Sequence, residues 1–386
     1  MTHTGVQNLQ LVFLVVSAKY PKQWRHDRLP TSSLPAQKRF KKHMIERKRC
    51  PVFVIGCPRS GTNLLYDTLL SSGGFAIYRG RVPVYQVLIP RFGRLDRLEN
   101  RKKIIAIWLR SEGFRRSGLD GVELTANVVE NCRSGGDFLR IIMGEIARKQ
   151  QVNRWAFYTP DTVVRVETVK KEIPEALFVH IIRDGRDIAL SLRKLGDFNP
   201  FPWSRRSRSM EETALYWEWM VQKGRRHGRK IPNDYLEIRY EDLVEDVRRT
   251  LKGLSEFLDH DLDYDRVQTA ALGTISKPNS SFREEAADAG FNAVQRWKRR
   301  LSQDQVASLE WQVGKTLEAL GYARTASVHG WKPTVRDKWL RAFYPLFLES
   351  KIWVKMNTPL GRFSSLAKLE LTAGEFPQSD SSSTGS

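Results

Sequence analysis

Residues 51–70 carry the pattern in this chain that says most about its chemistry. An apolar, β-branched run at 52–55 ends at Gly56, and apolar residues resume at helical spacing from Leu64. This pattern predicts a strand, a tight loop and the N-terminus of a helix. The first N–H groups of a helix have no partner within the helix, and the helix dipole is positive at that end. The segment therefore predicts a phosphate-binding loop.

The loop lacks the residue that a triphosphate would require. Its frame, Gly56-x4-Gly61-Thr62, has the spacing of a nucleotide-binding P-loop, but Gly61 is followed directly by Thr62 and no lysine intervenes. The loop instead offers Arg59, Ser60 and several backbone N–H groups, which suit one terminal phosphate and its substituent. We therefore expect a nucleotide that reacts at its 5′-phosphate and has no γ-phosphate.

A second anion site is predicted at the end of another strand. Residues 177–182 are typical of a buried parallel strand, and 188–192 continue as a helix. Arg183 follows the strand at its carboxyl end, where open α/β sheets bind ligands, and Ser191 lies on the helix. Their charge-assisted hydrogen bonds to a phosphate would each contribute about 1.5–3 kcal/mol. Two phosphate sites for one mononucleotide imply a 3′,5′-bisphosphate.

With these residues the chain resembles the sulfotransferase superfamily, whose members transfer a sulfuryl group from 3′-phosphoadenosine 5′-phosphosulfate (PAPS). Residues 57–65 are similar to its 5′-phosphosulfate loop, in the Pro-Arg-Ser-Gly-Thr form of the bacterial-type branch, and Arg183 with Ser191 to its 3′-phosphate pair. Segments 237–243 and 296–301 are similar to two further motifs, the second being the basic loop that closes over the nucleotide. The order of these motifs holds from residue 51 to residue 322.

The resemblance, together with recurring strand–helix signals, implies an α/β fold with a P-loop-like, mainly parallel central sheet flanked by helices and interrupted by helical insertions. It implies a PAPS-dependent sulfotransferase that needs no metal and acts on a hydroxyl or amine of a glycan, lipid or small metabolite. The residues expected to hold the nucleotide are Arg59, Ser60, Gly61, Thr62, Asn63, Arg183, Ser191, Tyr240, Trp297, Lys298 and Arg299.

The catalytic base is not evident from the sequence. An acceptor hydroxyl should lose its proton as it attacks sulfur, so a base is expected, and Arg59 with the helix N-terminus should stabilise the leaving group. The chain has Arg81 where relatives carry a glutamate, and residues 157–160 lack the acid and lysine of a second family motif. The candidates for the base are Asp161, Glu123 and His180.

Three alternatives remain open at this point. The protein is an enzyme, a catalytically silent protein that binds PAPS or its product adenosine 3′,5′-bisphosphate (PAP), or a nucleotide kinase that uses magnesium and a triphosphate. A histidine inside a strand, such as His180, is more often a residue of the core than a base, and the basic residues around Trp297 are also typical of a solvated face. Arg79 and Arg81 favour an anionic acceptor, such as an acidic sugar or a phosphorylated lipid.

Composition and charge suggest four regions. These are a basic N-terminal arm (1–50), one α/β domain (51–322), a C-terminal extension that packs on the core or at an interface (323–374) and a disordered tail (375–386). The net charge is +21, and residues 19–49 contain eleven basic and two acidic residues. This arm is expected either to contact anionic lipid or a polyanionic acceptor, or to pack as a helix on the core. We expect no nucleic-acid partner, because no recognition fold accompanies the charge.

The remaining signals concern location. The chain has three cysteines, spaced for neither a disulfide framework nor a zinc site, which favours a reducing, cytoplasmic compartment. A position peripheral to the membrane is the alternative, through the basic arm. An aromatic stretch at 339–353 is expected to cover the core, or to contact an apolar acceptor or a membrane.

Overall fold

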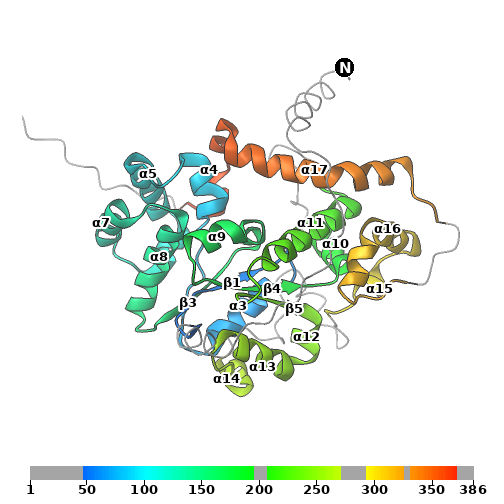
Figure 1. The fold of residues 1–386 in the computed structure, drawn as a ribbon, viewed down its shortest axis with the longest axis horizontal. Coiled ribbons are helices and arrows are strands. Elements are labelled where there is room, and N and C mark those ends of the chain that lie inside the picture. The colour runs from blue at the N-terminus through cyan, green and yellow to red at the C-terminus, as the bar shows by residue number, and fades with distance from the viewer. Residues whose placement is uncertain (1–46, 195–206, 271–292, 326–330, 372–386) are drawn as a thin grey trace, which may run out of the picture.

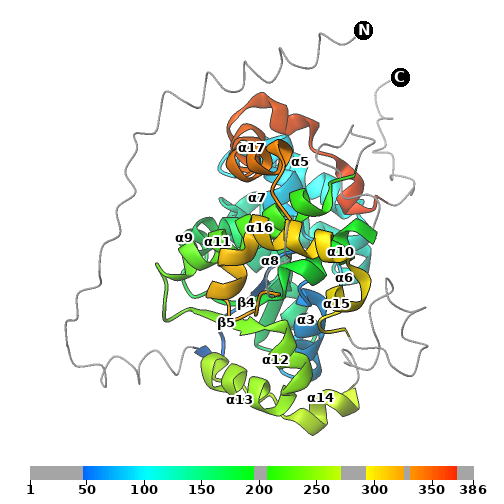
Figure 2. The ribbon, with the colours of Figure 1, turned by 90° about the vertical axis from the view of Figure 1, so that its right-hand side faces the viewer.

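The computed structural model describes residues 47–194, 207–270, 293–325 and 331–371, and Figures 1 and 2 show it in two perpendicular views. Most of the predicted basic arm, up to residue 46, lies outside the described residues, as does the predicted tail at 375–386.

A five-stranded parallel sheet forms the centre of the molecule. Its order is β2-β3-β1-β4-β5, and every adjacent pair is parallel. The strands are β1 (Val52–Ile55), β2 (Phe75–Ala76), β3 (Arg154–Tyr158), β4 (Leu177–Ile182) and β5 (Tyr235–Arg239). Parallel strands need crossover connections, and helices supply them here. The prediction of an α/β fold with a mainly parallel sheet is confirmed.

Both faces of the sheet are buried, because alternate side chains of each strand enter opposite cores. Phe53 and Ile55 of β1 belong to one apolar cluster, and Val52 and Val54 to the other; all four are fully buried. Helices α10 (Gly185–Lys194) and α11 (Met210–Gly228) cover the first face. Helices α3 (Thr62–Ser71), α12 (Tyr240–Glu245), α13 (Val247–Leu258) and α14 (Tyr264–Ala270) lie on the second face (Figure 1).

Helical insertions account for most of the chain between β2 and β4. The segment between β2 and β3 contains the π-helical turn η1 (Val84–Leu88) and helices α4 (Ile89–Phe92), α5 (Leu98–Leu109), α6 (Glu112–Ser117), α7 (Gly121–Asn131) and α8 (Gly135–Lys149). After β3 follow the short turn η2 (Pro160–Arg165) and helix α9 (Val166–Glu172). The family resemblance implied such insertions.

The C-terminal part comprises α15 (Trp297–Arg300), α16 (Gln303–Ala319), α17 (Val335–Asn357), η5 (Pro359–Phe363) and η6 (Leu366–Leu369). Helix α17 packs on α11 through the buried Leu340, Tyr344 and Leu348 and lies across the top of Figure 1. The chain then returns to the helical insertions, where Leu371 forms an antiparallel bridge with Ser111. In the described residues no helix has the length and apolar composition to cross a bilayer.

Phe53 lies at the centre of the larger core, and we expect its truncation to be costly. Its ring lies 5.4 Å from that of Phe178, 5.7 Å from that of Trp155 and 5.8 Å from that of Phe157. Phe53→Ala should lower the free energy of unfolding by about 3–5 kcal/mol in urea titration. The matched control Phe363→Ala, at a side chain 78% exposed, should change it by less than about 0.5 kcal/mol. Equal effects would contradict this assignment of the core.

Candidate functional site

The loop between β1 and α3 has the backbone that an anion cradle needs. Gly61 has a φ of 95°, and a Cβ added there would lie 2.4 Å from the ring of Tyr240, so glycine is required both by conformation and by space. Arg59 also adopts a positive φ, of 75°. Gly61 is the N-cap of α3 and has no side chain that could accept a hydrogen bond. The N–H groups of the first turn of α3 are therefore not capped by a side chain.

The loop also holds a buried hydroxyl that no described group satisfies. Ser60 is 1% exposed, and its Oγ has no hydrogen-bond partner among the described residues. Leaving such a group unpaired costs about 1–3 kcal/mol. A phosphate or sulfate oxygen in the loop would accept its hydrogen bond. The residues present therefore fit the 5′ group of a nucleotide such as PAPS.

The two anion sites predicted from the sequence lie together. The Arg59 Nε donates to the Ser191 Oγ at 3.0 Å, which joins the loop after β1 to helix α10 after β4. Burial lowers the pKa of Arg59, and the positive charges of Arg183 and Arg296 lower it further. Arg59 and Arg183 thus lie at the carboxyl ends of the adjacent strands β1 and β4, with Arg296 near them, an environment that favours a bound anion.

Arg183 is fixed between the loop and the segment that precedes α15. It is buried, its guanidinium lies 4.3 Å from the ring centroid of Tyr240, and its Nη1 donates to the Arg59 carbonyl at 3.3 Å. Its Nη2 donates to the carbonyl of Ala293, whereas its Nε has no partner in the described part of the chain. The Arg183 side chain, which is predicted to bind the 3′-phosphate, is therefore held in place by the protein. Its Nε–H remains available to donate a hydrogen bond to a ligand.

Asp187 contacts two of the predicted site residues, and the sequence analysis did not identify it. Its Oδ1 accepts the Trp297 backbone N–H at 2.9 Å, and its Oδ2 lies 3.8 Å from Arg183 Nη2. Burial raises the pKa of Asp187 to about 6; Arg183 opposes the rise, whereas Asp184 and Glu241 add to it. The carboxylate therefore ties the strand-end arginine to the start of α15.

The second arginine of the 183–187 segment faces a different neighbourhood. Arg186 forms buried ion pairs with Asp184 at 2.7 Å and with Glu310 at 2.6 Å. Its guanidinium also lies 3.8 Å from the ring centroid of Trp297. Trp297 is thus held by its backbone to Asp187 and by its ring to Arg186. The alternation of arginine and aspartate at 183–187 was the available signal for both contacts.

The other predicted nucleotide residues differ in exposure. Thr62 is buried at the start of α3, and Asn63 next to it is exposed. Lys298 and Arg299 lie exposed on α15, with the Lys298 Nζ 5.7 Å from the Trp297 ring centroid. The structure thus brings Arg59, Arg183, Ser191, Tyr240 and Gly61 into direct contact, and places the basic residues of α15 at its border through Trp297.

The three candidate bases occupy different places. His180 is fully buried in β4, its Nδ1 hydrogen-bonds with the Tyr235 hydroxyl, and burial lowers its pKa to about 3. Glu123 lies in the first turn of α7, beside a pocket of about 440 Å³, with no described contact to the loop. Asp161 lies in η2, directly after β3. Only Asp161 is therefore placed just beyond a strand's carboxyl end, at the edge that carries the loop.

Arg79 and Arg81, which favoured an anionic acceptor, both have carboxylate partners. Arg79 pairs with Asp67 of α3 at 2.9 Å, and Arg81 with Glu370 of the C-terminal extension at 3.2 Å. Both arginine side chains remain about half exposed, so each pair contributes little to stability, on the order of 0–1 kcal/mol. The C-terminal extension thus contributes a charge to this loop, which the sequence did not indicate.

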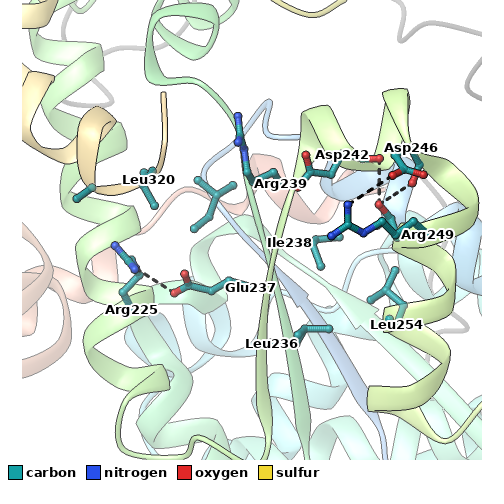
Figure 3. A pocket seen from close by; sticks show the side chains of 14 residues that line it. Arg225, Leu236, Glu237, Ile238, Arg239, Asp242, Asp246, Arg249, Leu254 and Leu320 are labelled. Carbon is teal, nitrogen blue, oxygen red and sulfur yellow. Dashed lines mark hydrogen bonds and ion pairs between the residues drawn. The ribbon is translucent and has the colours of Figure 1, made fainter. Parts of the chain in front are cut away.

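Two pockets lie near the strand ends. One of about 550 Å³ follows β5, with Glu237 and Arg239 on the strand, Arg225 on α11 and Arg249 on α13 (Figure 3). The other, of about 920 Å³, is bordered by Trp297 and Lys298 and by the buried Glu241, whose carboxylate accepts the Tyr322 hydroxyl. In the described residues no group of three or more His, Cys, Asp or Glu side chains could hold a metal ion.

Comparison with known proteins identifies the family of the chain. The model of the sulfotransferase family matches residues 51–266, more than half of the chain. The chain therefore belongs to the sulfotransferase family, and the resemblance drawn from its motifs is confirmed. The roles of the individual loop residues stay predictions. No curated protein matches the chain.

Solved structures that resemble the chain include three sulfotransferases. The sulfotransferase domain of the Synechococcus PCC 7002 olefin synthase is 18% identical, with 71% of this chain and 95% of that domain covered and a TM-score of 0.47. The sulfotransferase domain from the curacin biosynthetic pathway is 13% identical, with 72% and 100% covered and a TM-score of 0.43. The mouse sulfotransferase SULT7A1, solved with PAP, is 14% identical, with 72% and 93% covered and a TM-score of 0.40.

Asp187 makes stability depend on pH in a defined direction. A carboxyl whose pKa is raised to about 6 favours folding most when protonated, so its contribution is lost as the pH rises from about 4 to about 6. Asp187→Asn keeps the acceptor for Trp297 N–H and removes this titration. The unfolding free energy of the variant relative to the wild type should therefore increase across this range, measured by urea unfolding at several pH values. A difference that is constant with pH, or falls, would contradict the assignment.

Proposed function

We propose that this protein is a sulfotransferase that uses PAPS as its donor and a hydroxyl or amine as its acceptor, without a metal. The proposal is carried by one observation. An arginine from the loop after β1 hydrogen-bonds to the serine of α10, beside the arginine at the end of β4. Two basic groups that come from separate strand ends, with no P-loop lysine between them, fit a 3′,5′-bisphosphate better than the contiguous phosphates of a triphosphate.

The residues divide between the two ends of the nucleotide. Residues 59–63 would hold the 5′ group through the Arg59 guanidinium, the Ser60 hydroxyl and the N–H groups of the first turn of α3. Arg183 and Ser191 would hold the 3′-phosphate, and Trp297, Lys298 and Arg299 would border it, with Tyr240 supporting Arg183 by stacking. When bound, PAPS supplies a sulfuryl group on its 5′-phosphate. Arg59 and the N–H groups of α3 place positive charge where the leaving phosphate gains negative charge.

For the base, we propose Asp161 ahead of the other two candidates. Asp161 follows β3 directly, at the edge of the sheet where the loop lies. His180 sits in the sheet core, with a pKa depressed by burial, and Glu123 lies on a helix of the insertion. A base must come within hydrogen-bond reach of the acceptor proton. Asp161→Asn should then reduce turnover with little effect on PAP affinity.

Arg183→Ala separates the proposed sites at the two ends of the nucleotide. The variant should bind PAP about 10- to 100-fold more weakly in calorimetry, since one charge-assisted hydrogen bond is lost. Its affinity for adenosine 5′-phosphosulfate, which has no 3′-phosphate, should change far less. Arg193→Ala, at an exposed arginine of the same helix α10, is the matched control and should bind both ligands as the wild type does.

Binding titrations with PAP and with ATP and magnesium, together with an assay of sulfate transfer, distinguish the proposal from its alternatives. Tighter binding of ATP with magnesium than of PAP would favour a nucleotide kinase. PAP binding without transfer of labelled sulfate to any member of a panel of glycans, lipids and metabolites would favour a silent binding protein. An equal loss of both ligands in Arg183→Ala would contradict the assignment of Arg183 to the 3′ end.

We further propose that the acceptor is anionic. The ion pairs of Arg79 and Arg81 are half exposed and weak, so an acceptor anion can exchange for Asp67 or Glu370 at little cost. Arg81→Ala should reduce kcat/KM for acidic acceptors about 5- to 10-fold more than for neutral ones, on the basis of about 1 kcal/mol for such a contact. An unchanged ratio between acidic and neutral acceptors in the panel assay would contradict this part of the proposal.

A further inference from the structure

Helix α17 exposes an apolar stripe on the side opposite its buried face. Its core side chains Leu340, Tyr344 and Leu348 recur at helical spacing. On the other side, apolar residues recur at separations of four and seven residues, which places them on one line along the helix. They are Val335, Trp339, Leu346 and Trp353. The two tryptophans are 53% and 50% exposed, although tryptophan normally buries a large area.

This stripe concentrates the exposed apolar surface of the molecule. Of the ten large apolar side chains that are exposed in the described part of the chain, six lie between residues 335 and 363. Beyond the end of α17, Leu360 and Phe363 of η5 are also exposed, at 59% and 78%. In both views α17 lies at the outer boundary of the described fold (Figures 1 and 2). Such a concentration of exposed apolar side chains in one segment is typical of an interaction site.

The exposed charges that accompany this stripe are cationic. Lys332, Arg336 and Lys338 lie exposed at its N-terminal end and Arg362 at its C-terminal end; none forms an ion pair with another described residue. The acidic residues of α17 are engaged elsewhere. Asp337 is buried and caps the helix with Thr334, and Glu349 accepts from Trp219 and pairs with Lys223. The outward face of α17 therefore combines tryptophan with unopposed positive charge.

We propose that the outward face of α17, continued by η5, binds the surface of an anionic lipid bilayer, with the helix lying in the plane of the interface. Tryptophan favours this interface because its ring is apolar and its N–H is polar. Lysine and arginine beside an apolar stripe are typical of helices that lie on anionic membranes. A second copy of this chain fits the face less well, since each copy carries a net charge of +21 and the same cations would meet.

The experiment uses the full chain and sedimentation with vesicles. Vesicles of phosphatidylcholine alone are compared with vesicles that contain phosphatidylserine as well, at physiological salt. The wild type should bind the anionic vesicles. Trp339→Ser with Trp353→Ser should weaken this binding by about tenfold or more, because two large apolar side chains no longer enter the interface. Replacing Lys332, Arg336 and Lys338 with glutamine should weaken it by about fivefold for each charge and reduce its dependence on phosphatidylserine.

Matched controls separate this face from the rest of the positive charge. Val122→Ser removes an apolar side chain that is 81% exposed on α7, and a triple glutamine variant of Arg226, Arg229 and Lys252 removes three exposed cations elsewhere. Both controls should bind vesicles within about twofold of the wild type. All variants should keep the thermal stability and PAP affinity of the wild type, since none of the residues lies in the core or the loop.

Three outcomes would overturn the proposal. The first is a wild type that does not bind anionic vesicles. The tryptophan variant could bind as well as the wild type, which would assign binding to the basic arm. A lipid-free dimer in light scattering that the tryptophan substitutions dissociate would instead make the face an interface between two copies.

Discussion

The site depends on the parallel pairing of β1 with β4. Their register places Ile55 opposite His180, so the loop after β1 and the end of β4 emerge side by side at one edge of the sheet. Arg59 and Arg183 are brought together by this pairing. Burial lowers the pKa of Arg59, and the positive charges of Arg183 and Arg296 lower it further. Close, buried cations are unfavourable in the absence of a counter-charge. An anion bound between the two strand ends would relieve this repulsion, and the relief would contribute to its binding free energy.

In the segment 183–187, one arginine stabilises the fold and the other is placed to bind a ligand. Arg186 is saturated by Asp184 and Glu310 and carries the ring of Trp297, so its charge is used within the protein. Arg183 stacks on Tyr240, meets Asp187 at 3.8 Å without a hydrogen bond and keeps its Nε without a described partner. Asp187 contacts both parts, because its carboxylate lies beside Arg183 and accepts the backbone N–H of Trp297. The start of α15 is thereby mechanically linked to the arginine predicted to bind the 3′-phosphate.

The fold and the local conformation of the two predicted anion-binding segments could be predicted because their signals are local. The apolar run at 52–55, the glycines at 56 and 61 and the strand at 177–182 each specify their own conformation, and the structure has all of them. The acceptor side could not be predicted in the same way. The sequence presented Arg81 as an isolated cation, whereas Glu370, far along the chain, pairs with it. Asp187 was overlooked for the same reason, since its partner Trp297 is brought to it only by tertiary packing.

The C-terminal extension links the exposed face of α17 to the loop that carries Arg81. It covers α11 with the inner face of α17, turns at η5, where Arg91 donates to the carbonyls of Arg362 and Ser364, and ends beside Arg81 and Ser111. One continuous segment therefore carries both the exposed tryptophans and the carboxylate that meets the proposed acceptor loop. If the outward face of α17 lies on a lipid surface, that surface constrains the position of this segment, and with it the environment of Glu370. An acceptor held at a membrane would then approach a loop whose charge balance is set by the same element that contacts the lipid.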